Sequence, residues 1–168
     1  MQYWAASGNV EGLQQLLGVG NIEIDRVDRA GSTALMYAAE KGHEGCVRLL
    51  VEHKADVNHR DKFGETVLMH AVKAGKKPAC TWLLELKADI TVRDKSFGYS
   101  ALAHAASKGK HHILKLLLES HDAKPTKVCF EAAEDAGDDV AYGILREHLK
   151  RIQGRPPPAD PVPPPPPL

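Results

Sequence analysis

The chain has 168 residues, and its 22 lysines and arginines balance its 22 aspartates and glutamates, which argues against binding to nucleic acid by bulk charge. A hydrophobic content of 43% with only 5% aromatic residues supports a core of aliphatic side chains and alanine, and excludes global disorder. Three scattered cysteines form neither a disulfide framework nor a CxxC zinc site. Because neither a signal peptide nor a membrane-spanning stretch is recognised, we expect a reduced, soluble, intracellular protein of the cytoplasm or nucleus.

The chain opens with a shortened copy of a unit that the following residues repeat. Residues 28–60 align with residues 61–93 without a gap, and 13 of the 33 aligned positions are identical. The register continues at Asp94 and then shifts by one residue near Phe97, so that a further copy follows. Self-similarity at this period predicts a repeat architecture. The predicted repeats are residues 1–27, 28–60, 61–93 and 94–123.

Each repeat predicts a turn followed by two short helices. Gly31 lies in a polar run that suits a tight turn with positive φ, and the Thr33 hydroxyl suits the N-cap of a helix. A first helix then carries Leu35 and ends at Gly42, and a second helix carries Leu50 among apolar residues at helical spacing. No single repeat can bury its apolar face alone, so the copies must stack into a solenoid.

These units resemble ankyrin repeats. The segments GSTALMYAA, EKGHEGCVRLL and KADVN match the family pattern closely, and the 33-residue period is that of the family. The resemblance covers roughly residues 1–122, although the motif proline is replaced at Ala34, Val67 and Ala101, and the extra residue near Phe97 alters the fourth turn. It implies an all-α solenoid of stacked helix–turn–helix units with hairpin loops.

The C-terminal part of the chain departs from the repeat. Thr126 suits the start of a helix that Gly137 ends, and Asp139 suits the negatively charged start of a second helix. We expect residues 124–152 to form a degenerate helix pair that caps the stack, because a terminal repeat faces water on one side. Residues 153–168 are rich in proline and predict a disordered, extended polyproline II arm.

The sequence holds no pattern typical of catalysis or metal binding. Nine histidines are present, but the adjacent His111 and His112 point in different directions on a helix, and no H-E-x-x-H spacing occurs. The histidines are interpreted as surface and repeat-consensus residues. Cys46 and Cys80 lie near core positions, where thiols are usually inert. We therefore predict a non-catalytic protein that needs no metal and no cofactor.

The ankyrin resemblance implies that a partner contacts the hairpin tips and the exposed side of the first helices, which form the concave face. Eight basic and two acidic side chains occupy these positions, and three aromatic residues lie at or near tips that we expect to face water. Exposed aromatic residues beside arginine are typical of interface anchors, so we predict a partner protein with acidic and apolar features. The alternative is a solvated face with spare positive charge. The predicted positions are Arg29, Ser32, Glu40, Lys41, Arg60, Lys62, Phe63, Glu65, Lys73, Arg93, Lys95, Phe97, Tyr99, Ser107 and Lys108.

Two further sites are predicted from short motifs. Arg155, Pro158 and Pro161 match R-x-x-P-x-x-P, one orientation of an SH3 ligand, and the proline run that follows suits a profilin-like protein. The alternative is a solvated tail. Asn58 suits a structural bond to local turn backbone, while the ankyrin resemblance also implies a substrate for asparaginyl hydroxylation.

Three functional hypotheses follow. The preferred one is an adaptor or scaffold, monomeric on its own, whose stack binds one protein while the proline-rich arm recruits another. The second is a regulator or inhibitor of an enzyme such as a protein kinase, because small ankyrin proteins of this size include cyclin-dependent kinase inhibitors. The third, nucleic-acid binding through the basic face, is disfavoured by the neutral net charge and the absence of a reading motif.

Overall fold

The chain folds into short helices that pair along the sequence, in a computed structural model that describes residues 1–20, 22–120 and 123–153. The first helices of the pairs are α1 (Gln2–Ser7), α3 (Ala34–Lys41), α5 (Val67–Lys73), α7 (Ala101–Ser107) and α9 (Lys127–Asp135). The second helices are α2 (Val10–Gly18), α4 (Glu44–Glu52), α6 (Lys77–Glu85), α8 (His111–Glu119) and α10 (Asp139–Gln153).

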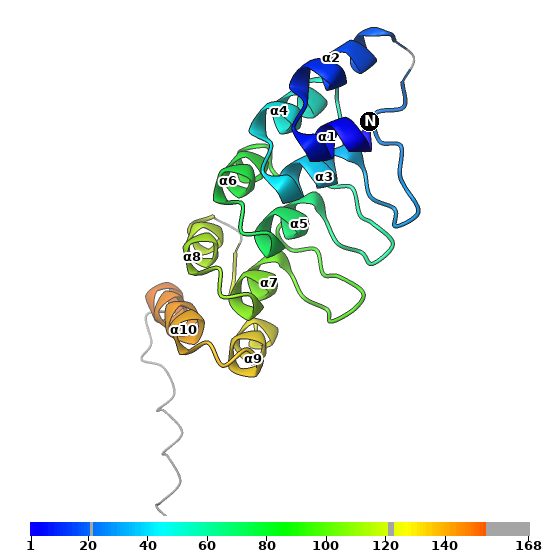
Figure 1. Ribbon diagram of the computed structural model, residues 1–168. Helices are drawn as coiled ribbons and strands as arrows, with labels where there is room; N and C mark the ends of the chain where they lie inside the picture. Colours follow the sequence, from blue (N-terminus) through cyan, green and yellow to red (C-terminus); the bar gives the residue numbers. More distant parts are fainter. Residues whose placement is uncertain (21, 121–122, 154–168) are drawn as a thin grey trace, which may run out of the picture.

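The pairs stack side by side in two layers (Figure 1). The odd-numbered helices form an inner layer in which each helix packs on the next, and the even-numbered helices form an outer layer in the same order. Hairpin loops connect α2 to α3, α4 to α5 and α6 to α7, and they project from the inner-layer side of the stack (Figure 1). Arg60 and Thr66 form an isolated antiparallel bridge across one of these hairpins. The predicted all-α solenoid with hairpin loops is confirmed.

Hydroxyl caps start the inner helices, as the repeat pattern predicted. The side chains of Thr33, Thr66 and Ser100 each accept a hydrogen bond from the amide three residues later, at 3.3–3.4 Å. Such a cap satisfies one of the amides that have no partner within the first turn. Gly42 ends α3 with a φ of 79°, which places it in the left-handed region that favours glycine.

The core runs along the stack between the two layers. Alanines dominate the buried faces of the inner helices, which lets those helices approach one another closely, while leucines, isoleucine and valine fill the space toward the outer helices. Leu50, Leu83 and Leu114 are fully buried at successive levels of this core. Each repeat therefore buries its apolar face against its two neighbours, as expected for a solenoid.

The last helix pair starts with different capping chemistry. Thr126 precedes α9 in an extended conformation, but its side chain makes no capping bond to the backbone. Asp138 precedes α10, and its carboxylate accepts hydrogen bonds from the Ala141 amide and the His111 ring. These bonds outweigh burial and lower the pKa of Asp138 below its ordinary value, the Ala141 bond contributing most. The His111 bond ties the last pair to α8.

None of the helices within the described residues combines the length and the apolar character needed to span a bilayer.

Candidate functional site

One aspartate organises each hairpin. The first carboxylate oxygen of Asp28 accepts hydrogen bonds from the amides of Ala30 and Ser32, at 2.8 and 3.0 Å. Asp61 and Asp94 bind amides of the following residues in the same way, at 2.7–3.1 Å. Aspartate favours turns because its side chain bonds to the backbone two residues ahead. The hairpins are therefore held in shape by their own first residue.

The second carboxylate oxygen joins each hairpin to the adjacent inner helix. Tyr37 donates its hydroxyl hydrogen to Asp28 at 2.6 Å, and this bond is the main reason that the pKa of Asp28 is lowered. His70 and His104 occupy the equivalent helix positions and bind Asp61 and Asp94 through Nε2, at 3.0 and 2.7 Å. His104 is buried, so it is one of the repeat-consensus histidines and not one of those at the surface.

The His104–Asp94 pair makes stability depend on pH. Burial lowers the pKa of His104 below its ordinary value of 6.5, although Asp94 and Glu65 oppose this effect and Lys73 adds to it. Below about pH 6.5, His104 is protonated more readily in the unfolded chain than in the folded one. The contribution of His104 to the free energy of unfolding is therefore fully present above that pH and is lost as the pH decreases. Burial would raise the pKa of Asp94, but hydrogen bonds from the Phe97 amide and His104 outweigh it. The lowered pKa of Asp94 makes a second loss of stability follow at still lower pH.

We expect the His104→Gln variant to lose less stability than the wild type between pH 7.5 and pH 5.5, because glutamine places a non-titrating donor near the position of Nε2. Urea unfolding at the two pH values measures the difference. His53→Gln is the matched control, since His53 is exposed and bonds only to the Leu49 carbonyl of its own helix among the described contacts. An identical pH dependence for wild type and His104→Gln contradicts this account of His104.

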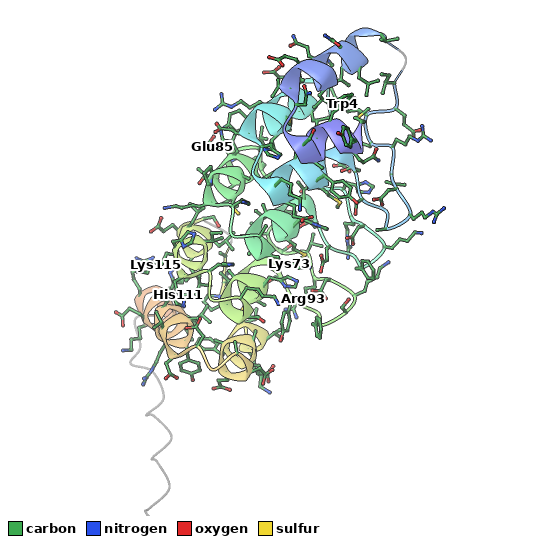
Figure 2. All side chains as sticks on the ribbon, viewed as in Figure 1. Trp4, Lys73, Glu85, Arg93, His111 and Lys115 are labelled. Atoms are coloured by element: carbon green, nitrogen blue, oxygen red, sulfur yellow. The ribbon has the colours of Figure 1, made fainter. Side chains whose placement is uncertain are left out.

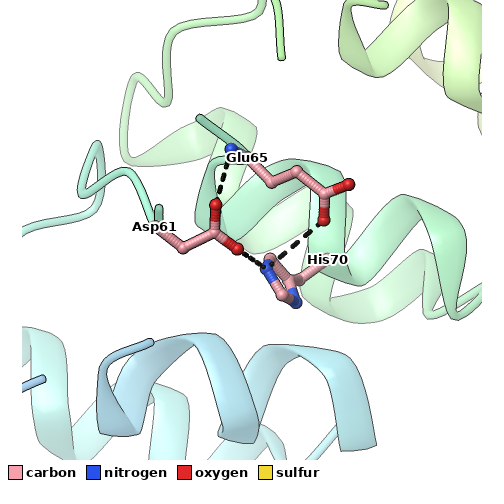
Figure 3. A group of neighbouring side chains, drawn as sticks. All are labelled: Asp61, Glu65 and His70. Carbon is pink, nitrogen blue, oxygen red and sulfur yellow. Dashed lines mark hydrogen bonds and ion pairs between the residues drawn. The ribbon is translucent and has the colours of Figure 1, made fainter. Parts of the chain in front are cut away.

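Glu65 is buried, and its carboxylate lies within 4.8 Å of ligand atoms from two neighbouring hairpins, the one that begins at Asp61 and the one that begins at Asp94. Figure 3 shows Asp61, Glu65 and His70 together, with the Asp61 carboxylate accepting the Glu65 amide and contacting His70. The Glu65 carboxylate lies 3.6 Å from His70 Nε2 and accepts hydrogen bonds from Lys73 Nζ at 2.7 Å on both oxygens. Glu65 therefore pairs with side chains of α5.

The carboxylates and imidazoles of this region have the donor types of a metal site. Two groups, Asp61 with Glu65 and His70, and Glu65 with Asp94 and His104, bring their ligand atoms within 4.8 Å of one another. However, Lys73 occupies both oxygens of Glu65, and Asp61 accepts two amides and a ring nitrogen. A cation would have to displace these bonds. The arrangement is therefore better suited to fixing the hairpins than to binding metal.

Three consecutive hairpin tips form a continuous edge of the molecule. The Lys62 amide donates to the Ala30 carbonyl at 3.1 Å, and the Lys95 amide donates to the Phe63 carbonyl at 2.8 Å. Lysine side chains reinforce these contacts, because Lys62 Nζ donates to the Arg29 carbonyl at 2.6 Å. We call the exposed side chains along this edge, which are Arg29, Lys62, Phe63, Lys95 and Phe97, the tip ridge.

The aromatic residues near the tips fall into two kinds. Phe63 is 56% exposed and Phe97 is 73% exposed, as predicted for residues that face water. Tyr99 instead packs on the core and lies edge-on to the His104 ring, at 5.5 Å between centroids. The expectation that Tyr99 faces water is therefore wrong. Its ring also contacts Phe97, which supports the third tip.

The arrangement of helix pairs and hairpins has a counterpart among known families. A model of ankyrin repeats (3 copies) matches residues 1–94 and residues 44–129, which together cover most of the chain. The chain belongs to the ankyrin-repeat family. No curated protein matches the sequence. Ankyrin repeats are generally protein–protein interaction modules, so the family and the exposed tips point to the same kind of surface.

The other predicted contact positions of this ankyrin-repeat protein lie around the ridge. Arg60 and Arg93 are exposed beside the hairpins, and an Arg60 guanidinium nitrogen donates to the Arg93 carbonyl at 3.0 Å. Figure 2 shows Arg93 and Lys73 on the hairpin side of the molecule, with Glu85 and Lys115 on the outer-helix side.

The inner-layer side carries the remaining positions. Lys41 pairs with Glu40 at 3.0 Å, and Lys108 is exposed just after α7. Ser107, the last residue of α7, is half-buried. Ser32 is buried like Glu65, so the expected exposure of these two side chains is wrong. The Ser32 amide donates to Asp28 within its hairpin, and the Glu65 carboxylate accepts hydrogen bonds from Lys73.

Asn58 makes a longer-range contact than the sequence suggested. Its side-chain oxygen accepts the Asp89 amide of the next repeat at 2.8 Å, and Asp25 accepts the Asp56 amide in the same manner at 3.0 Å. The expectation of a bond to the local turn is therefore wrong, because these side chains link successive ankyrin repeats. Hydroxylation of Asn58 stays a prediction.

Two further regions are the proline-rich motif and a cavity between the last two outer helices. The SH3-type motif, made of Arg155, Pro158 and Pro161, lies outside the described residues.

A cavity of about 490 Å³ lies between α8 and α10, and its apolar lining includes Leu118 and Ile144. Nothing in the repeat pattern points to this cavity, because it depends on how the long last helix of the ankyrin stack packs against α8.

Proposed function

We propose that the chain is a non-catalytic adaptor that binds a partner protein through the tip ridge and the adjoining face of the inner helices. A partner with acidic and apolar features suits this surface. The proline-rich motif at Arg155, Pro158 and Pro161 is proposed as a second docking element, for an SH3-type or profilin-like protein. Regulation of an enzyme such as a protein kinase would use the same ridge.

The exposed charge at the tips carries this proposal. Among the described residues, no carboxylate lies within 4.0 Å of the charged groups of Arg29, Lys62 or Lys95, and none of the exposed ridge side chains is acidic. Phe63 and Phe97 stand exposed among these cations. Large aromatic side chains near basic groups are typical of the residues that dominate binding energy at protein interfaces.

A double variant of the two anchors tests the proposal. We expect Phe63→Ala with Phe97→Ala to weaken binding of the main partner by about 2 kcal/mol or more, which corresponds to a loss of about 30-fold in affinity. The measurement is quantitative affinity capture from cell extract, followed by photo-crosslinking from benzoylphenylalanine placed at position 63. A partner that crosslinks from position 63 and is lost in the double variant supports the proposed surface.

The control for this experiment lies on the outer layer. Val140→Ala with Lys115→Glu changes an apolar side chain of the outer helix α10, which is 58% exposed, and one cation of α8 on the outer-helix side (Figure 2). This variant is expected to retain the same partner. If both variants retain the same proteins and position 63 yields no crosslink, the tip ridge is not the binding surface.

A further inference from the structure

We infer that the tip ridge binds an unstructured acidic peptide segment that carries carboxylates at every third residue and lies across the tips in a polyproline II conformation. This inference deepens the proposed function, on which it rests, by specifying the chemistry and spacing of the partner. It is carried by the period of the ridge, by its unpaired charge and by the order of its side chains.

The period of the ridge follows from its backbone. Each hairpin consists of two antiparallel chain segments, which pair between Arg60 and Thr66 in the second hairpin. The third hairpin lies beside the second, because the Lys95 amide donates to the Phe63 carbonyl. Two strand-like spacings of about 4.8 Å each give a period of about 10 Å. The inner helices beneath the hairpins pack in the same order, and neighbouring packed helices lie about 8–10 Å apart. The cations Arg29, Lys62 and Lys95, which occupy the same position in three tips, therefore recur about every 10 Å.

The exposed charge of the ridge is positive. Lys62 Nζ and Lys95 Nζ each donate one hydrogen bond to a carbonyl of the preceding tip, at 2.6 and 3.4 Å. An ammonium group carries three donors, so each lysine keeps donors for a ligand. The aspartates of the tips already have partners. Asp61 and Asp94 are buried and accept amides and ring nitrogens, while Asp28 is half-buried and accepts two amides and the Tyr37 hydroxyl. A row of cations with carboxylates turned inward is complementary to an acidic partner.

The spacing of about 10 Å between the ridge cations fits one backbone conformation of the partner better than the others. A polyproline II helix has three residues per turn and rises about 3.1 Å per residue, so every third side chain returns to one face after about 9.3 Å. A β-strand presents every second side chain at about 6.8 Å and turns every third one to the opposite face. An α-helix would place side chains seven residues apart at a suitable distance, but helices usually dock in hydrophobic grooves rather than on a ridge. Acidic segments extend because their charges repel one another, and polyproline II is a major conformer of unfolded and proline-containing chains.

The order of side chains places the apolar contacts. Phe63 follows Lys62, and its carbonyl accepts the Lys95 amide, so the Phe63 backbone lies between the second and third tips, while Phe97 follows Lys95 within the third tip. Both aromatic side chains are exposed. A matching segment has carboxylates at its first, fourth and seventh positions and apolar residues after the second and third carboxylates. The sequence Glu-Pro-Ser-Glu-Leu-Pro-Glu-Leu satisfies this pattern.

Fluorescence anisotropy with labelled peptides and the full chain tests the inference. The matching peptide is compared with an isomer of the same composition, Glu-Pro-Glu-Ser-Glu-Leu-Pro-Leu, and with a helical peptide whose carboxylates lie seven residues apart. We expect the matching peptide to bind about tenfold more tightly than either comparison peptide, and its affinity to fall as salt is added. Equal affinity for the first two peptides overturns the proposed spacing, and tighter binding of the helical peptide overturns the proposed conformation.

Ridge variants locate the binding and separate the two proposals. Lys62→Glu is expected to weaken the matching peptide by about tenfold, whereas Lys115→Glu on the outer-helix side leaves its affinity unchanged. Thermal melting checks that both variants are folded. If position 63 still crosslinks to a captured protein but the matching peptide does not bind, the inferred partner chemistry is wrong and the proposed function stands. If neither occurs, both are wrong.

Discussion

Replacing Leu83 with alanine is expected to lower the free energy of unfolding by about 2–5 kcal/mol. Leu83 is fully buried in α6, which packs against α4 on one side and α8 on the other. Truncation removes apolar surface from the core and leaves a cavity that the neighbouring repeats can fill only in part. The loss falls on two interfaces at once, because each repeat of a solenoid contacts only its neighbours.

Urea unfolding monitored by circular dichroism measures this effect. Val140→Ala removes two methyl groups from a side chain of α10 that is 58% exposed, and is expected to change the free energy by less than about 0.5 kcal/mol. A cost below about 1 kcal/mol for Leu83→Ala would show that the stack closes around the missing side chain, which contradicts the tight packing described for the core. A lower m-value for Leu83→Ala would show either that less surface is exposed on unfolding or that the stack no longer unfolds in two states.

The Gly31→Ala substitution is expected to cost about 2–4 kcal/mol, which exceeds the cost of the left-handed backbone alone. Gly31 has a φ of 84°, and an added Cβ would lie 2.9 Å from the Lys62 amide nitrogen and 3.2 Å from Lys62 Cγ. The amide is backbone and donates to Ala30, so it cannot move without breaking the bond between the first two tips. The substitution therefore strains the hairpin and separates it from the next one.

Gly98→Ala is the matched comparison for this prediction. Gly98 also has a positive φ, of 68°, but an added Cβ there would meet no atom within 4 Å. Its expected cost is therefore about 1–2 kcal/mol, from backbone strain alone. Thermal and urea unfolding of the two variants give the difference. If the two costs are the same, the contact between the first and second tips does not stabilise the fold.

Much of the fold is predictable from the sequence because the same capping residues and apolar positions recur in each repeat. The hydroxyl caps at Thr33, Thr66 and Ser100 and the buried leucines lie where local spacing placed them. Capping and helical periodicity act within a few residues, so one sequence contains the information they need.

The candidate site is less predictable because it depends on contacts between repeats. The position of a residue in the repeat predicts the exposure of Phe63 correctly. It fails for Glu65, whose carboxylate pairs with Lys73 and whose side chain is buried. Tyr99 fails for a related reason, because its ring packs against His104. The bond from the Asp89 amide to Asn58 spans 31 residues, and no local pattern reveals it.

The three buried cysteines can be used to detect local unfolding of the stack. Cys46, Cys80 and Cys129 are completely shielded from solvent and lie in α4, α6 and α9, which belong to the second, third and fifth helix pairs of the stack. Burial raises the pKa of Cys80 to about 12, which suppresses its reactive thiolate further. A thiol reagent can therefore modify each cysteine only when its own level unfolds, so the order of modification in the unaltered protein would reveal which end of the stack frays first.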